Sequence, residues 1–101
     1  MLNVLKNLFS SKDLSKIINE NTLIVDVRSA TEFDSGSVKG AVNIPLDRVQ
    51  NNIDKFKNKS NIIVFCRSGN RSGQAKNILN EMGINNVTNG GTWQNVAQFV
   101  K

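Results

Sequence analysis

The sequence predicts an α/β domain with a mainly parallel sheet. Two apolar runs, residues 22–27 and 62–65, are too short for helices and carry almost no polar residue. Runs of this kind are typical of strands that are covered on both faces of a sheet. Segments with apolar residues at helical spacing alternate with these runs, as in chains built from strand–helix–strand units. We expect about four or five strands, flanked by helices on both faces.

The N-terminal half is predicted to hold one long strand, one short strand and several short helices. Residues 1–11 are expected to form a helical or mobile arm, followed by a short helix near residues 14–18 with Ser11 as its cap. After the strand at 22–27, one helical turn is expected at residues 30–33, with Phe33 directed into the core. The remaining expected elements are a very short strand at 42–44 and a helix at 46–56 that begins after Pro45.

The C-terminal half is organised around the strand at residues 62–65. A helix is expected from about Ser72 to Met82, because the apolar residues Ala75, Ile78, Leu79 and Met82 share one face. Gly83 is expected to end that helix. The last expected elements are a brief strand at 86–88, a sharp turn at 89–91 and an apolar helical face at 93–100.

Size and composition indicate one domain, which we place at residues 12–101. The chain has 101 residues, of which 39% are hydrophobic, enough for one core and too few for two. The formal charge is +5, but the lysines are scattered, so a nucleic-acid partner is not expected. No segment resembles a secretory signal or a membrane span. We therefore expect a cytoplasmic protein, acting as a monomer.

The content of cysteine and histidine restricts the chemistry. One cysteine forbids an internal disulfide, which suits a reducing compartment. The absence of histidine removes Ser-His and Cys-His nucleophile pairs and nearly all zinc and haem sites. We therefore expect neither a metal nor a cofactor.

Two charged residues lie at the end of the first long strand. Asp26 and Arg28 are two positions apart, so their side chains point to the same side of a strand. Charges beside a buried strand need partners. We favour a bracing role through hydrogen bonds to neighbouring loops over a catalytic one.

The only cysteine, Cys66, lies where the central strand ends and a polar loop begins. Backbone N–H groups from Arg67 to Ser72 can curl around one point, Gly69 permits the tight turn, and the following helix adds its dipole. Arg67 and Arg71 add two positive charges. This environment predicts a thiol pKa below the ~8.5 of free cysteine. An inert, buried cysteine is the alternative, but packing alone needs no cationic, glycine-bearing loop.

The loop Cys66-Arg67-Ser68-Gly69-Asn70-Arg71-Ser72 resembles the active-site loop of the rhodanese family of sulfurtransferases. Two further segments resemble family motifs in the same order. They are the signature formed by Asp26-Val27-Arg28, Glu32-Phe33 and residues 36–45, and Gly90-Gly91 followed by Trp93. The resemblance extends from about Thr22 to the end and implies a rhodanese-like fold. Ser37 departs from it, because the family often has histidine there.

The resemblance implies a specific reaction. Cys66 would take a sulfane sulfur from an anionic donor such as thiosulfate and pass it from a persulfide to cyanide, a thiol or a protein. Substrate would be bound by the loop residues Arg67, Ser68, Gly69, Asn70, Arg71 and Ser72. Asp26, Arg28 and Trp93 would support the loop. A thiolate held by dipoles needs no general base, in agreement with the lack of histidine.

Two other functions remain open. Cysteine phosphatases and arsenate reductases use a C-x5-R loop, whereas Arg71 is only five positions after Cys66. The shorter loop is expected to suit one sulfur atom better than a tetrahedral phosphate. A sulfur carrier or binding module of the same fold, which serves a protein partner, is the second alternative.

Overall fold

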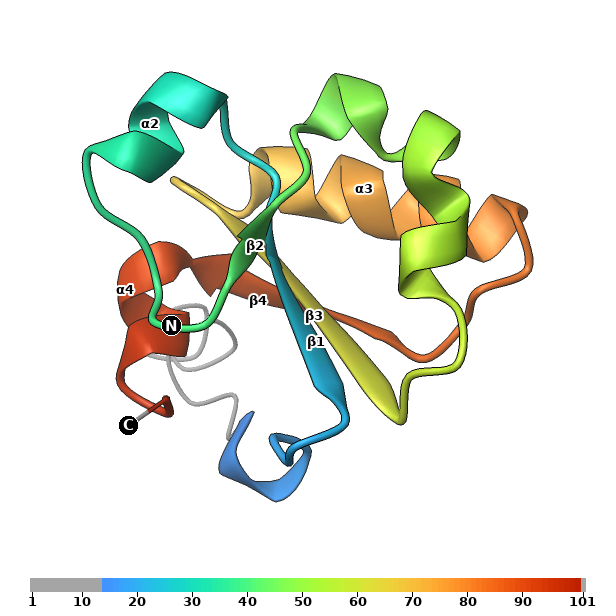
Figure 1. Cartoon of the computed structure of the whole chain (residues 1–101), viewed down its shortest axis with the longest axis horizontal. Coiled ribbons are helices and arrows are strands. Elements are labelled where there is room, and N and C mark those ends of the chain that lie inside the picture. The colour runs from blue at the N-terminus through green and yellow to red at the C-terminus, as the bar shows by residue number, and fades with distance from the viewer. Residues whose placement is uncertain (1–13, 101) are drawn as a thin grey trace, which may run out of the picture.

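The structure, a computed structural model, describes residues 14–100 and contains one parallel sheet in that range (Figure 1). The strands are β1 (Thr22–Asp26), β2 (Val42–Asn43), β3 (Asn61–Cys66) and β4 (Val87–Thr92). Their order across the sheet is β2-β1-β3-β4, and every pairing is parallel. The prediction of an α/β domain with a parallel sheet is therefore confirmed, and the two long apolar runs form its two central strands.

Helices cover both faces of this sheet (Figure 1). The α-helices are α2 (Ala30–Asp34), α3 (Asn70–Glu81) and α4 (Trp93–Ala97), and the 3-10 helices are η1 (Leu14–Lys16), η2 (Leu46–Arg48) and η3 (Gln50–Phe56). α3, η2 and η3 contribute to one core cluster, and η1 and α4 to the other. Within residues 14–100, no helix has the length and apolar character needed to cross a membrane.

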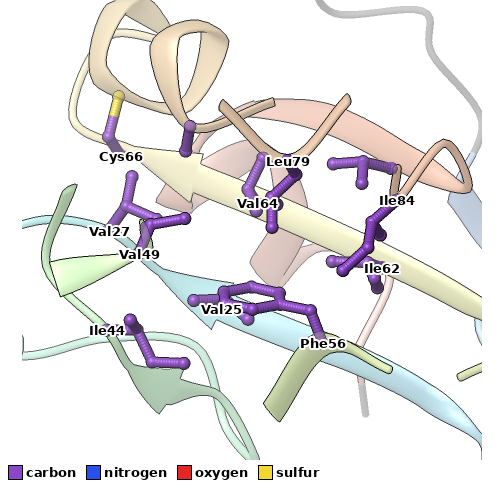
Figure 2. Close-up of a cluster of buried hydrophobic side chains, with 12 residues drawn as sticks. Val25, Val27, Ile44, Val49, Phe56, Ile62, Val64, Cys66, Leu79 and Ile84 are labelled. Carbon is purple, nitrogen blue, oxygen red and sulfur yellow. The ribbon is translucent and has the colours of Figure 1, made fainter. Parts of the chain in front are cut away.

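The two core clusters lie on opposite faces of β3, which contributes side chains to both. Ile62, Val64 and Cys66 point toward α3 and η3, where Leu79 and Phe56 are buried (Figure 2). Ile63 and Phe65 point to the other face, toward Leu14 and Val96. This alternation follows from the two-residue period of a strand. The cysteine thus ends a strand whose position is fixed from both sides.

The prediction of one helix at residues 46–56 is wrong. The segment forms the two 3-10 helices η2 and η3, and Asn52 has non-helical angles of φ −118° and ψ 28°. Its side-chain Nδ2 donates a hydrogen bond to the carbonyl of Arg48 at 2.8 Å. Asparagine side chains compete in this way with the backbone bonds of an α-helix. The apolar spacing predicted the buried face of this segment but not its helix type.

The predicted turn at residues 89–91 is also wrong, because β4 continues to Thr92. Val64 pairs with Asn89 and Phe65 with Gly91, so Gly90 is an extra residue that forms a bulge. A Cβ at Gly90 would lie 2.6 Å from Val96 Cγ2. Glycine is needed here because the strand passes close to α4.

Several smaller expectations also change. α3 begins at Asn70 rather than near Ser72, and Gly83, just past its end, has the expected left-handed φ of 89°. α4 ends at Ala97. Phe33 is only half-buried and Met82 is exposed, so neither enters the core as expected. The arm at residues 1–11 and the Ser11 cap lie outside the described residues.

Candidate active site

Cys66 is the last residue of β3, which lies between β1 and β4 in the sheet. Its side chain is buried, and its sulfur points from the end of the strand toward the first turn of α3 (Figure 2). The chain then makes a short loop and enters α3 at Asn70. In sheets of parallel strands, ligands bind outside the carboxyl ends of the strands. The thiol therefore stands at the end of the sheet where ligands are expected.

Backbone N–H groups and one hydroxyl surround the sulfur. The N–H of Gly69 donates to Cys66 Sγ at 3.0 Å, and Ser72 Oγ lies 3.4 Å from the same sulfur. Gly69 has φ +95°, a left-handed conformation that glycine adopts without strain. The loop closes on the sulfur because glycine stands at this position.

These donors favour the ionised sulfur. Burial raises the pKa of the Cys66 thiol, but hydrogen bonds from the Ser72 side chain and from the N–H groups of Ser72, Ser68 and Gly69 outweigh burial and lower it. The expected direction of the pKa is therefore found. Its cause is the set of hydrogen bonds around the sulfur more than the two arginines.

The two arginines of the loop have different surroundings. Arg71 donates from Nη1 and Nη2 to the Glu32 carboxylate of α2, at 2.8 and 3.1 Å. The hydrogen bond from Arg71, followed by that from the Ser29 backbone, lowers the pKa of Glu32 to about 2, and the pKa of Arg71 is raised in turn. Arg67 is exposed. Glu32, which sequence reasoning noted only as part of a motif, thus balances one of the two charges.

Asp26, Arg28 and Trp93, the expected supporting residues, lie together: Asp26 and Arg28 are buried, and Trp93 is half-buried. Arg28 Nη2 is 2.7 Å from Asp26 Oδ2, and its guanidinium lies 5.6 Å from the centre of the Trp93 ring. Such a distance permits a cation–π contact. The hydroxyl of Ser37 donates to Asp26 Oδ2 at 2.7 Å, so serine gives this carboxylate a hydrogen bond.

Arg28 also reaches the loop before β2. Its Nη2 donates to the Gly36 carbonyl at 2.7 Å. These side-chain contacts join the end of β1 to the loop before β2 and to the start of α4, and none of them involves the sulfur. They are the contacts expected of the bracing role.

Ser68 and Asn70 face outward. Both are exposed, and the N–H of Asn70 donates to Ser68 Oγ at 3.5 Å. The amide of Gln74 donates to Asn70 Oδ1 at 3.0 Å. The backbone of Ser68 contributes to the sulfur's surroundings, while the two side chains lie at the outer rim of the loop.

One residue of the site, Asn89 of β4, was missed by sequence reasoning. Its Oδ1 accepts from Ser72 Oγ at 2.7 Å and from the Gly91 N–H at 3.0 Å, and its Nδ2 donates to the Gly69 carbonyl at 3.1 Å. One side chain thus joins the loop, the first turn of α3 and β4. The sequence carried a weak signal for it, a polar residue before two glycines, which also fits a turn.

Comparison with known proteins gives a consistent result. The family model described as "Rhodanese-like domain" matches residues 10–92. The thiosulfate sulfurtransferase PspE of Escherichia coli (strain K12) is 40% identical over 75 residues, covering 72% of this chain and 72% of that protein. The adenylyltransferase and sulfurtransferase UBA4 of Meyerozyma guilliermondii is 42% identical over 86 residues, which cover 77% of this chain and 20% of that protein.

A solved structure agrees with these matches. The structure described as "rhodanese with anions from E. coli" superposes with a TM-score of 0.68 at 38% sequence identity. The alignment covers 75% of this chain and 92% of the other.

Proposed function

The chain belongs to the rhodanese-like domain family, and from this premise we propose that it is a sulfurtransferase that carries sulfur as a persulfide on Cys66. Its similarity to a thiosulfate sulfurtransferase over most of both chains supports the enzyme class. The observation that carries the assignment to Cys66 is the Gly69 N–H, which donates to the buried sulfur at 3.0 Å. A cysteine that only filled space would need no such donor.

In the proposed reaction, the Cys66 thiolate attacks the outer sulfur of thiosulfate. The bond between the two sulfur atoms of thiosulfate breaks, and sulfite leaves with the electron pair. Cys66 then carries a persulfide, whose terminal sulfur is attacked by cyanide or a thiol. Attack by cyanide releases thiocyanate and restores the thiolate. No external oxidant is needed, because sulfite leaves with the electron pair, and no general base is needed, because the loop hydrogen bonds lower the pKa of the Cys66 thiol and so favour its ionised form.

The loop residues have separate proposed roles. The N–H groups of Ser68, Gly69 and Ser72 stabilise the negative sulfur, since each lowers the pKa of the Cys66 thiol. Arg67 attracts the anionic donor, and Arg71, held by Glu32, fixes the first turn of α3. The side chain of Asn70 lies at the rim, where an acceptor would approach. Arg71 stands five positions after Cys66, so we propose a loop that fits one sulfur and excludes phosphate.

The experiment is turnover with thiosulfate and cyanide, together with the intact mass of the protein. Wild-type protein should gain the mass of one sulfur atom after thiosulfate treatment and lose it with cyanide. Cys66→Ala should show neither the adduct nor turnover. An unchanged rate in this variant, with its fold verified by circular dichroism, contradicts the enzyme assignment.

The carrier function makes a different prediction in the same experiment. A carrier for one protein partner should form the persulfide but react slowly with cyanide and small thiols. The match with UBA4 covers only 20% of that protein, so a sequence of this kind also occurs within a much longer chain. Rapid turnover with small acceptors favours the free-standing enzyme.

We further propose that residues 12–101 act as one monomeric domain in the cytoplasm. The unpaired thiol supports a reducing compartment, because it must remain free for the reaction. Light scattering of the purified chain and cell fractionation test the two parts of this proposal.

A further inference from the structure

The orientation of the Asn89 side-chain amide is determined by three contacts. Its Oδ1 accepts from Ser72 Oγ and from the Gly91 N–H, and its Nδ2 donates to the Gly69 carbonyl. The reverse orientation would set Nδ2 against the Gly91 N–H and Oδ1 against the Gly69 carbonyl. Asn89 therefore presents an acceptor, not a donor, to Ser72.

A serine hydroxyl has one hydrogen, and two acceptors are available to the hydroxyl of Ser72. Asn89 Oδ1 lies 2.7 Å from Ser72 Oγ, and Cys66 Sγ lies 3.4 Å from it. While the hydrogen points to Asn89, the lone pairs of Ser72 face the sulfur. This arrangement suits a thiol, which donates its own hydrogen, but it opposes a thiolate, which only accepts.

Ionisation of Cys66 therefore favours rotation of the Ser72 hydroxyl from Asn89 to the sulfur. The rotation leaves no polar atom without a partner, because the Gly91 N–H still donates to Asn89 Oδ1 at 3.0 Å. Hydrogen bonds to charged groups are stronger than neutral ones, so the bond to the thiolate wins at the longer distance. The neutral hydrogen bond from Ser72 to Asn89 must therefore be broken whenever Cys66 ionises.

We propose that Asn89 is a positioning residue of the sulfur site, whose amide oxygen competes with Cys66 Sγ for the hydroxyl hydrogen of Ser72 and so controls how readily the thiol ionises. The inference rests on the proposed role of Cys66 as the nucleophile. It goes beyond that role because it places part of the control on Asn89 of β4, which acts on the sulfur through Ser72.

The substitutions at Ser72 and Asn89 remove none of the other groups around the sulfur. They are the N–H groups of Ser68, Gly69 and Ser72, and the positive charge of Arg71, which Glu32 partly balances. Asn89→Ala also removes the bond to the Gly69 carbonyl, but this loss is the same with and without the Ser72 hydroxyl, so the comparison of the two backgrounds reports on the hydroxyl. Because Cys66 is the only cysteine in the chain, all thiolate absorbance belongs to it.

The test is a titration of thiolate absorbance in four proteins: wild type, Ser72→Ala, Asn89→Ala and the double variant. Asn89→Ala should ionise at lower pH than wild type, because Ser72 is then free to donate to the sulfur. Its thiolate fraction below the midpoint should be about three- to tenfold larger, the scale of one neutral hydrogen bond. Ser72→Ala should ionise at higher pH, and adding Asn89→Ala to it should change nothing.

A contrary result is equally clear. If Asn89→Ala raises the midpoint, or shifts it as much without the hydroxyl as with it, then Asn89 only shapes the loop and the proposal is overturned. Failure of the proposed function is a separate outcome, because a protein that forms no persulfide still gives this titration.

A second measurement needs only wild type and Ser72→Ala, in case the Asn89 variants do not fold. The backbone N–H of Gly91 shares Asn89 Oδ1 with Ser72, so its NMR resonance should move downfield as Cys66 ionises and Ser72 turns away. In Ser72→Ala this movement should be largely lost. A movement that persists in Ser72→Ala reflects only the nearby charge and contradicts the proposal.

Discussion

Replacement of Glu32 with glutamine should remove the charge that holds Arg71 while keeping the cap of α2. Glu32 forms a capping box with Ser29, and glutamine serves in that position as glutamate does. The carboxylate also accepts two hydrogen bonds from Arg71, at 2.8 and 3.1 Å. The variant therefore loses the ion pair between α2 and α3 and little else.

The size of the effect follows from the pKa of Glu32. The hydrogen bond from Arg71, followed by that from the Ser29 backbone, lowers this pKa from 4.5 to about 2. Without screening, such a change is worth ~3 kcal/mol of unfolding free energy at neutral pH. The Glu32 and Arg71 side chains are 31% and 35% exposed, so water screens the pair and we expect ~1 kcal/mol. Because the folded pKa is the lower one, this stabilisation is complete above pH 4.5 and is lost as the pH falls through about 2.

Thermal unfolding measures this contribution. At pH 7, Glu32→Gln should melt ~4–8 °C below wild type, the shift that 1 kcal/mol produces in a domain of this size. The difference should shrink as the pH falls toward 2. Asp54→Asn is the matched control, because Asp54 pairs with Lys57 while the two side chains are 88% and 57% exposed. Equal melting of both variants, or a difference that persists in acid, refutes the reasoning.

Three further substitutions test the packing of β4 against α4, the buried ion pair of Arg28 with Asp26, and the binding of the anionic sulfur donor. Gly90→Ala places a Cβ 2.6 Å from Val96 Cγ2 and should lower the unfolding free energy by ~1–3 kcal/mol, measured with denaturant. Arg28→Met leaves the fully buried carboxylate of Asp26 without its cation and should cost ~3–5 kcal/mol in the same measurement. Arg67→Gln should raise the KM for thiosulfate about two- to fivefold with little change in kcat, since it removes one exposed charge.

Each of these substitutions has a control. Gly73→Ala adds a Cβ at an ordinary 3.4 Å contact and should not destabilise α3, so equal losses at both glycines would contradict the steric argument. Asp26→Asn combined with Arg28→Met should recover part of the lost stability, and no recovery argues against a charge effect. Lys55→Gln removes an exposed charge on η3 and should leave the KM unchanged. If Lys55→Gln raises the KM for thiosulfate as much as Arg67→Gln does, the KM depends on the net charge of the protein and not on Arg67 in particular.

The sequence predicted the sheet well because burial determines its pattern. Every residue of β3 after Asn61 is buried, so the whole run had to be apolar. The bulge in β4 was not predictable in this way. Gly90 is required by the distance to Val96, a contact that exists only after α4 has packed on the sheet.

The candidate site divides in the same manner. Cys66, Gly69 and Ser72 lie within seven residues, so the spacing alone indicated a thiol within a closed loop. Glu32 pairs with a residue 39 positions away, and Asn89 with one 17 positions away. Such partners depend on which elements the sheet brings together, and no local pattern identifies them.

The arrangement of charge around the loop separates two steps of the proposed reaction. Within residues 14–100, the three ion pairs include Arg28, Lys57 and Arg71, but not the exposed Arg67. The sulfur is held mainly by N–H groups and a hydroxyl, at distances of 3.0 and 3.4 Å, which salt does not screen. Donor capture depends on the exposed charge of Arg67, which salt does screen.

Added salt should therefore raise the KM for thiosulfate while leaving the ionisation of Cys66 almost unchanged. Steady-state kinetics and the thiolate titration, both over a range of potassium chloride concentrations, measure the two quantities separately. The Arg67→Gln variant should lose most of the salt dependence of the KM, because the screened charge is gone. If the thiolate titration moves with salt as strongly as the KM does, the negative sulfur is stabilised by mobile side-chain charge, and the assignment of that role to the loop N–H groups is incorrect.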